Sequence, residues 1–300
     1  MAAAHTGAKK RYFFLDSWAL SEYSTPRKSA ALVSYMATHD YLPVVNSLSL
    51  TELFNPGWAN APGVERGERT TSLIADLACS IVDPVVVIRA ELRSYPDPLP
   101  RMPIQLDLSL IGNHVRREVL LRFLRSDPLF LAQGRDVRKW AASYAAMKQK
   151  WSDSLRTILD DAVRKGLLLE DGPTYRFPTP VAREDFLLSL DRRLLGVLDA
   201  DEWRALGRNL IDLTLGATRQ LPSVRLSSLL FLHTYVEVPS NFQRRVADSD
   251  LGDLFHLWIA TYCSVVTADT SMKRVLERLR SEAKLSCDIL DPNDLRTVVS

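Results

Sequence analysis

The feature that most constrains the fold is a late segment, residues 250–269, in which acids flank an apolar helix and strand. Asp250 and Asp253 open an almost wholly apolar stretch, which leads into the β-branched run 265–267, and Asp269 follows two residues later. A carboxylate beside a hydrophobic core is costly unless it is paired or holds a metal ion. Helix capping is the simplest explanation for the first two acids, because an acid satisfies free N–H groups at a helix N-terminus.

A second strand followed by an acid lies near the start of the chain. Residues 12–15 (Tyr-Phe-Phe-Leu) form the short apolar run expected of a buried strand, and Asp16 follows at once as a cap for a helix at 18–23. In open α/β sheets, ligands bind beyond the carboxyl ends of the strands. If both strands belong to one parallel sheet, they deliver Asp16 and Asp269 to the same edge.

Helices and strands alternate at both ends of the chain, which is typical of a parallel sheet covered on both faces. Further strands are predicted at 42–45, 84–88 and 287–290, and a helix is predicted at 64–82. We therefore predict an α/β fold with a doubly wound parallel sheet.

The middle of the chain has a different pattern. A proline-rich stretch at 94–103 ends the alternation, and residues 106–235 are mostly helical, with a D-G turn that predicts a β-hairpin at 166–177. A large all-α insertion into the α/β core is the simplest organisation. The predicted domains are the first part of the core at 1–98, the helical insertion at 99–237, and the second part of the core at 238–300.

Composition excludes several classes of protein. The net charge of +2 indicates no field directed at nucleic acid, and no apolar run approaches the roughly 20 residues that span a bilayer. The three cysteines show no C-x-x-C spacing, and neither glycine-rich phosphate-binding motif occurs. The N-terminus lacks the apolar core of a signal peptide, because Asp16 ends the first apolar run too early. We expect a cytoplasmic protein without a membrane partner.

The acids suggest a metal site. Glu52 lies in a short apolar helical stretch, and with Asp250 or Asp253 it can lean over the edge that carries Asp16 and Asp269. Four or five carboxylates that close cannot all stay ionised without a cation, and hard oxygen ligands select Mg²⁺ or Mn²⁺. Such a site activates water and neutralises phosphoryl oxygens, which predicts hydrolysis of a phosphodiester bond.

Four short motifs resemble those of the PIN-domain nucleases, in the usual order of that family. They are Tyr-Phe-Phe-Leu-Asp16-Ser, Leu-Thr-Glu52-Leu, Gly-Asp253-Leu-Phe-His256 and Val-Val-Thr267-Ala-Asp269. The run at 287–290 is similar to the last strand of that fold, and the resemblance covers residues 10–95 and 238–300. It implies a PIN-like sheet and a Mg²⁺- or Mn²⁺-dependent ribonuclease acting on single-stranded RNA. An inhibitory, antitoxin-like protein partner is compatible with the resemblance.

The resemblance also implies a role for each acid. Asp16, Glu52, Asp253 and Asp269 are the implied catalytic residues and metal ligands. The supporting residues are Thr267 as a hydroxyl, Asp250 as the competitor of Asp253 for the third position, and His256 one turn beyond it. A lone histidine is more often a core residue than a ligand. Compact members of the family are about half as long as this chain, so the insertion is unexplained.

Other functions fit parts of the sequence. The main alternative is a catalytically inactive PIN-like module that binds nucleic acid or protein and whose acids do not assemble. In a further interpretation, basic residues of 113–165 share one surface and present nucleic acid to the acids. A haloacid-dehalogenase-type phosphatase needs an acid two residues after Asp16, where this chain has Trp18.

Overall fold

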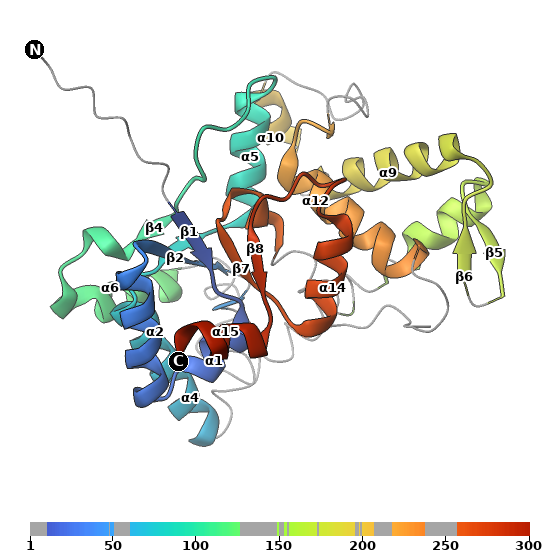
Figure 1. Cartoon of the computed structure of the whole chain (residues 1–300). Helices are drawn as coiled ribbons and strands as arrows, with labels where there is room; N and C mark the ends of the chain where they lie inside the picture. Colours follow the sequence, from blue (N-terminus) through green and yellow to red (C-terminus); the bar gives the residue numbers. More distant parts are fainter. Residues whose placement is uncertain are drawn as a thin grey trace, which may run out of the picture.

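A six-stranded sheet forms the centre of the protein (Figure 1). The computed structural model describes residues 11–47, 49–50, 61–126, 149, 153–154, 156–172, 174–195, 198, 200–206, 218–237 and 257–300. The strands lie in the order β4-β3-β2-β1-β7-β8, and every neighbouring pair is parallel except β3 with β4. Their bounds are β1 Arg11–Phe14, β2 Tyr41–Asn46, β3 Ser80–Val82, β4 Leu106–Asp107, β7 Val265–Thr267 and β8 Asp288–Leu290. The predicted α/β class with a mostly parallel sheet is confirmed.

Helices cover both faces of this sheet because side chains alternate along each strand. Phe13 and Leu15 pack into one cluster with residues of α1, α2, α4, α6 and α15, whereas Tyr12 and Phe14 pack into another with α9, α12 and α14. These helices are α1 Ser17–Tyr23, α2 Pro26–Thr38, α4 Ala61–Asp76, α6 Asn113–Ser126, α9 Pro180–Leu195, α12 Pro222–Leu232, α14 Thr270–Leu279 and α15 Pro292–Val299. In Figure 1, α2 and α14 lie on opposite sides of the strands.

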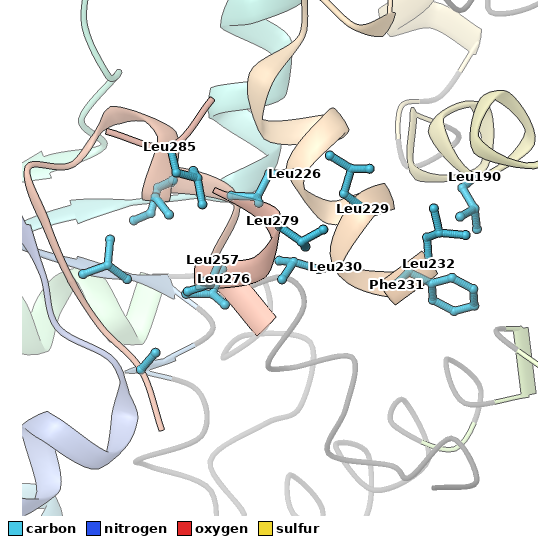
Figure 2. Packing of buried hydrophobic residues seen from close by; sticks show 14 of the residues in the cluster. Leu190, Leu226, Leu229, Leu230, Phe231, Leu232, Leu257, Leu276, Leu279 and Leu285 are labelled. Carbon is cyan, nitrogen blue, oxygen red and sulfur yellow. The ribbon is translucent and has the colours of Figure 1, made fainter. Parts of the chain in front are cut away.

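The second cluster is centred on α12, whose side chains from Ser223 to Leu232 are all buried. Figure 2 shows Leu226 and Leu230 of α12 beside Leu279 of α14, with Leu232 directed towards α9. A helix that is buried all round needs partners on every side. Helix α12 therefore joins the helical middle of the chain to the α/β core.

The structure corrects one strand and the helix before it. The apolar run predicted as a strand at 84–88 is the start of helix α5, Pro84–Ser94, and the strand is β3 at 80–82. The helix predicted at 64–82 accordingly ends at Asp76. A short apolar run has no periodicity that separates strand from helix, but an acid followed by proline at 83–84 is a helix start.

Several predicted elements of the helical middle are present. Helices α9, α10 (Ala200–Ala205) and α12 lie there, and the predicted hairpin is formed by β5 (Leu169–Asp171) and β6 (Thr174–Arg176). Figure 1 shows this hairpin beyond one end of α9, away from the sheet. The short strand β4 falls within the range 99–237 and yet pairs with β3. Within the described ranges, no helix has the length and apolarity needed to cross a membrane.

An arginine on α9 ties the helical middle to the end of the chain. Arg183 donates from Nη1 and Nη2 to the two carboxylate oxygens of Glu282, at 3.0 and 3.1 Å, and from Nε to Glu237 at 2.5 Å. Glu237 ends the π-helical segment η3, His233–Glu237. Burial alone raises the pKa of Glu237, but the His233 ring and the Arg183 guanidinium outweigh it and lower the pKa to about 2. The ionised pair is therefore the stable form.

Replacing Arg183 with lysine tests this three-residue ion cluster. Lysine keeps the positive charge but cannot form the paired bonds to Glu282 and the bond to Glu237 at once. We expect Arg183→Lys to lower the free energy of unfolding by about 1 kcal/mol, measured by urea denaturation at pH 7. Arg164→Lys, on an exposed ion pair with Asp161, is the control and is expected to change it by less than ~0.5 kcal/mol. Equal effects in both variants contradict the prediction.

Candidate functional site

The site lies where the order of the strands reverses. From β1 the chain builds outward through β2 and β3 on one side, and later returns to place β7 and then β8 on the other side. Adjacent parallel strands that lead away in opposite directions leave a crevice at their carboxyl ends, and ligands of open α/β sheets bind there. In this chain the two strands are β1 and β7. Asp16 follows the first and Asp269 follows the second.

Thr267 joins the two strand ends directly. Its hydroxyl oxygen accepts a hydrogen bond from the backbone N–H of Asp16 at 2.9 Å. The hydroxyl hydrogen is within reach of the Phe14 carbonyl oxygen and of Asp16 Oδ1, each 3.2 Å from Oγ1. Thr267 is fully buried and Asp16 is 9% exposed. These contacts fix the position of the Asp16 carboxylate relative to β7.

Both aspartates that follow these strands cap helices. Asp16 precedes α1 and its Oδ1 accepts from Ala19 N–H at 3.0 Å, while Asp269 precedes α14 and its Oδ1 accepts from Met272 N–H at 2.7 Å. Each cap residue has extended backbone, as N-caps do. The positive ends of the two helix dipoles also offset the negative charge at this edge. The cap predicted for Asp16 is thus confirmed, and Asp269 has the same local role.

A cap bond uses part of the hydrogen-bonding capacity of a carboxylate. A carboxylate has two oxygens and about four acceptor positions, and each cap bond uses one of these positions. Carboxylate and hydroxyl oxygens are hard donors, which suit Mg²⁺ or Mn²⁺ better than a softer metal. Over the described part of the chain, no group of three or more His, Cys, Asp or Glu side chains is placed to hold a metal ion.

The remaining predicted site residues lie outside the described residues. They are Glu52, Asp250, Asp253 and His256. The structure therefore brings together Asp16 and Thr267, and it places Asp269 at the end of the same strand as Thr267. The grouping of these three with the other four remains a prediction. Much of the basic range 113–165 also lies outside the described residues.

Polar side chains that the sequence did not single out extend the same edge. At the end of β2, Asn46 Oδ1 accepts from Ser49 N–H at 2.6 Å, and the Ser47 hydroxyl donates to Asp83 at 3.2 Å. Asp83 follows β3 directly, and Asp291 follows β8 as the cap of α15. A polar residue straight after a buried strand was the signal that identified Asp16, and it applies equally to Asp83 and Asp291.

Comparison of the chain with protein-family models, with curated proteins and with solved structures finds no match. The site is therefore described by its own geometry. That geometry is a pair of adjacent parallel strands, β1 and β7, each followed by an aspartate; Asp16, Thr267 and Asp269 at their carboxyl ends are defined here as the switch-point site.

Proposed function

We propose that this chain is a Mg²⁺- or Mn²⁺-dependent nuclease that hydrolyses phosphodiester bonds of single-stranded RNA at the switch-point site. The observation that carries the proposal is the position of two aspartates after adjacent strands, at the point where the strand order reverses. The resemblance of the acidic motifs to PIN-domain nucleases supports the same conclusion. On this proposal the sheet is PIN-like and the helical middle is an insertion into it.

The residues of the site have distinct roles in the proposed reaction. Asp16 and Asp269, together with Glu52 and Asp253, would hold the cation. A bound Mg²⁺ or Mn²⁺ supplies an activated water and neutralises charge on the phosphoryl oxygens. Thr267 is a positioning residue, because its hydroxyl fixes the backbone and Oδ1 of Asp16. No covalent nucleophile from the protein is required.

A binding module without catalytic activity is the second candidate. It is favoured by the cap bonds, because helix capping accounts for Asp16 and Asp269 without a metal ion. In that case the acids stabilise α1 and α14, and nucleic acid or a protein partner binds elsewhere on the fold. Cleavage of RNA distinguishes the two candidates.

The test is an assay of the full chain with end-labelled single-stranded RNA in Mn²⁺, in Mg²⁺ and in excess chelator. We expect cleavage with either metal and none with chelator, because the carboxylates need a cation to act on a phosphodiester. Duplex RNA and single-stranded DNA of the same sequence measure the preference for single-stranded RNA. Cleavage that persists in chelator contradicts the metal mechanism, and RNA that is bound but intact favours the binding module.

A further inference from the structure

A buried acid lies away from the switch-point site, on helix α5. Glu91 is 2% exposed. The surrounding hydrophobic cluster combines residues of α5, α9, α10 and α12 with Trp258 of the 3₁₀ segment η5, Leu257–Tyr262. Its buried members are Ile88, Leu92, Leu195, Leu198, Trp203, Leu221, Val224 and Trp258. A carboxyl group in such surroundings is costly when ionised unless a cation accompanies it.

Glu91 joins three elements through one oxygen. Its Oε1 accepts from the hydroxyl of Tyr262 at 2.6 Å and from the backbone N–H of Ser223 at 3.0 Å. Tyr262 ends η5, and Ser223 is in the first turn of α12. We call this contact of α5, α12 and η5 the Glu91 joint. The joint lies next to the proposed site in the chain, because Tyr262 is three residues before β7.

The second oxygen of Glu91, Oε2, is buried and makes no hydrogen bond to any of the described residues, although the hydroxyl of Ser223 lies near the carboxyl group. An ionised carboxylate has two oxygens that share the charge, so the ionised form would keep one of them unsolvated inside an apolar cluster. The protonated acid carries no net charge and avoids that cost. The geometry thus favours the neutral acid while the joint is closed.

The charged and titratable groups around Glu91 also favour its neutral form. Burial raises the pKa of Glu91 to about 7, although the bonds from Tyr262 and Ser223 lower it in part. Among the described residues, Tyr262 is the titratable group that faces Glu91 from η5, and burial also raises the pKa of that phenol. From α12 the contacts come from Ser223, while the α12 cation Arg225 is directed towards Glu282 at 3.4 Å. Among the described residues, therefore, no cation compensates a negative charge on Glu91.

We propose that the Glu91 joint is a proton-dependent latch: Glu91 is a neutral acid in the closed joint, and loss of its proton favours an open joint in which water reaches the carboxylate. The sign follows from linkage. The folded form holds the proton more tightly than an exposed glutamate, with its ordinary pKa of 4.5, does. The closed joint is thus fully stable below about pH 4.5 and loses stability as the pH rises to about 7.

The size of the change in the opening equilibrium follows from the difference between the pKa of Glu91 in the closed joint and its pKa when exposed. Between pKa values of 4.5 and about 7, the equilibrium constant for opening increases by up to about 300-fold as the pH rises. Above that range the effect is complete and does not grow. This property is independent of the proposed nuclease activity, because it concerns the attachment of α12 and η5 to α5.

Amide hydrogen exchange of the full chain tests the latch. The reporter is the Ser223 N–H, which donates to Glu91, and its protection factor is corrected for the intrinsic pH dependence of exchange. In the wild type we expect this protection factor to fall by up to about 300-fold between pH 4.5 and pH 8. Glu91→Gln, which imitates the neutral acid and keeps an acceptor oxygen, is expected to show no such fall. A pH-independent wild type, or a fall that persists in Glu91→Gln, overturns the proposal.

A second variant and a direct titration keep the test independent of one substitution. Tyr262→Phe removes a donor that favours the ionised form, so the midpoint of the pH dependence is expected to move to higher pH. A midpoint that stays in place or moves lower overturns the proposal. The side-chain carboxyl of Glu91 can also be titrated in the wild type by carbon-13 NMR, with Glu91→Gln to assign the signal. If Glu91 titrates near pH 4.5 in the folded chain, the proposal is overturned.

Discussion

The Asp16→Asn variant is expected to lose metal-dependent cleavage of single-stranded RNA by roughly 100-fold or more while it keeps its fold. Asparagine caps helices as well as aspartate does, so the bond from Ala19 N–H to the side chain can persist. The same side chain can also accept from Thr267. Only the negative charge is removed, and with it the ability to hold a cation. Asp269→Asn is expected to behave in the same way.

The fold of these variants is measured separately from their activity. The midpoint of thermal unfolding without metal is expected to be unchanged or slightly higher for Asp16→Asn, because in the proposed site one of several close negative charges is removed and their repulsion falls. Alanine at the same position is a poorer choice, since the loss of the cap costs about 1 kcal/mol. Cleavage at the level of the wild type in either asparagine variant removes the nuclease proposal.

Asp291→Asn is a matched control for this prediction. Asp291 follows β8 as the cap of α15 and accepts from Asn293 N–H and Asp294 N–H, at 2.9 and 3.1 Å. Its backbone angles, φ −86° and ψ 178°, are close to the φ −80° and ψ 178° of Asp16. The control has no role in the switch-point site, so cleavage is expected to remain. A loss as large as that of Asp16→Asn would show that acid removal at any cap of this edge is sufficient.

Thr267→Val is expected to lower both stability and cleavage. Valine matches threonine in shape, but it leaves the buried backbone N–H of Asp16 without its acceptor. An unsatisfied buried donor costs about 1–3 kcal/mol, which urea denaturation measures as a lower free energy of unfolding. Because the hydroxyl also orients Asp16, cleavage is expected to fall by roughly 10- to 100-fold, as is usual when a residue that orients a metal ligand is lost.

Thr267→Ser separates the hydroxyl from the shape of the side chain. Serine keeps an oxygen that can accept from Asp16 N–H and donate to Oδ1. We expect most of the cleavage to return, with a loss of stability of about 1 kcal/mol for the missing buried methyl group. Equal cleavage in the valine and serine variants contradicts the positioning role of Thr267.

The elements of the core were largely predictable from local pattern. The strands at 12–15, 42–45, 265–267 and 287–290 lie within a residue or two of β1, β2, β7 and β8. The strand predicted at 84–88 was wrong, because consecutive valines occur in buried helices as well as in buried strands. The helix signal at Asp83 and Pro84 was present in the sequence but was outweighed by β-propensity.

The buried polar groups were predictable only in part. Glu91 follows Val87 and Ile88 by four and three residues, so helical periodicity places it on the buried face once residues 84–94 are known to be a helix. Its partners were not predictable, because Tyr262 is 171 residues away and Ser223 is 132 residues away. The bonds between Arg183 and Glu282 were not predictable for the same reason, because the two residues are 99 positions apart in the sequence.

The sequence alone determined the α/β class, the strands that end in acids, and the helical character of the middle, because these follow from periodicity, capping and turn residues close together in the chain. Only the tertiary structure decided that β7 lies beside β1, so that Thr267 bonds to Asp16 across 251 residues. It also decided that Glu91 lies where α5, α12 and η5 meet, with no cation beside it among the described residues. Contacts between distant segments depend on how whole helices and strands pack, and local residue patterns carry no record of that packing.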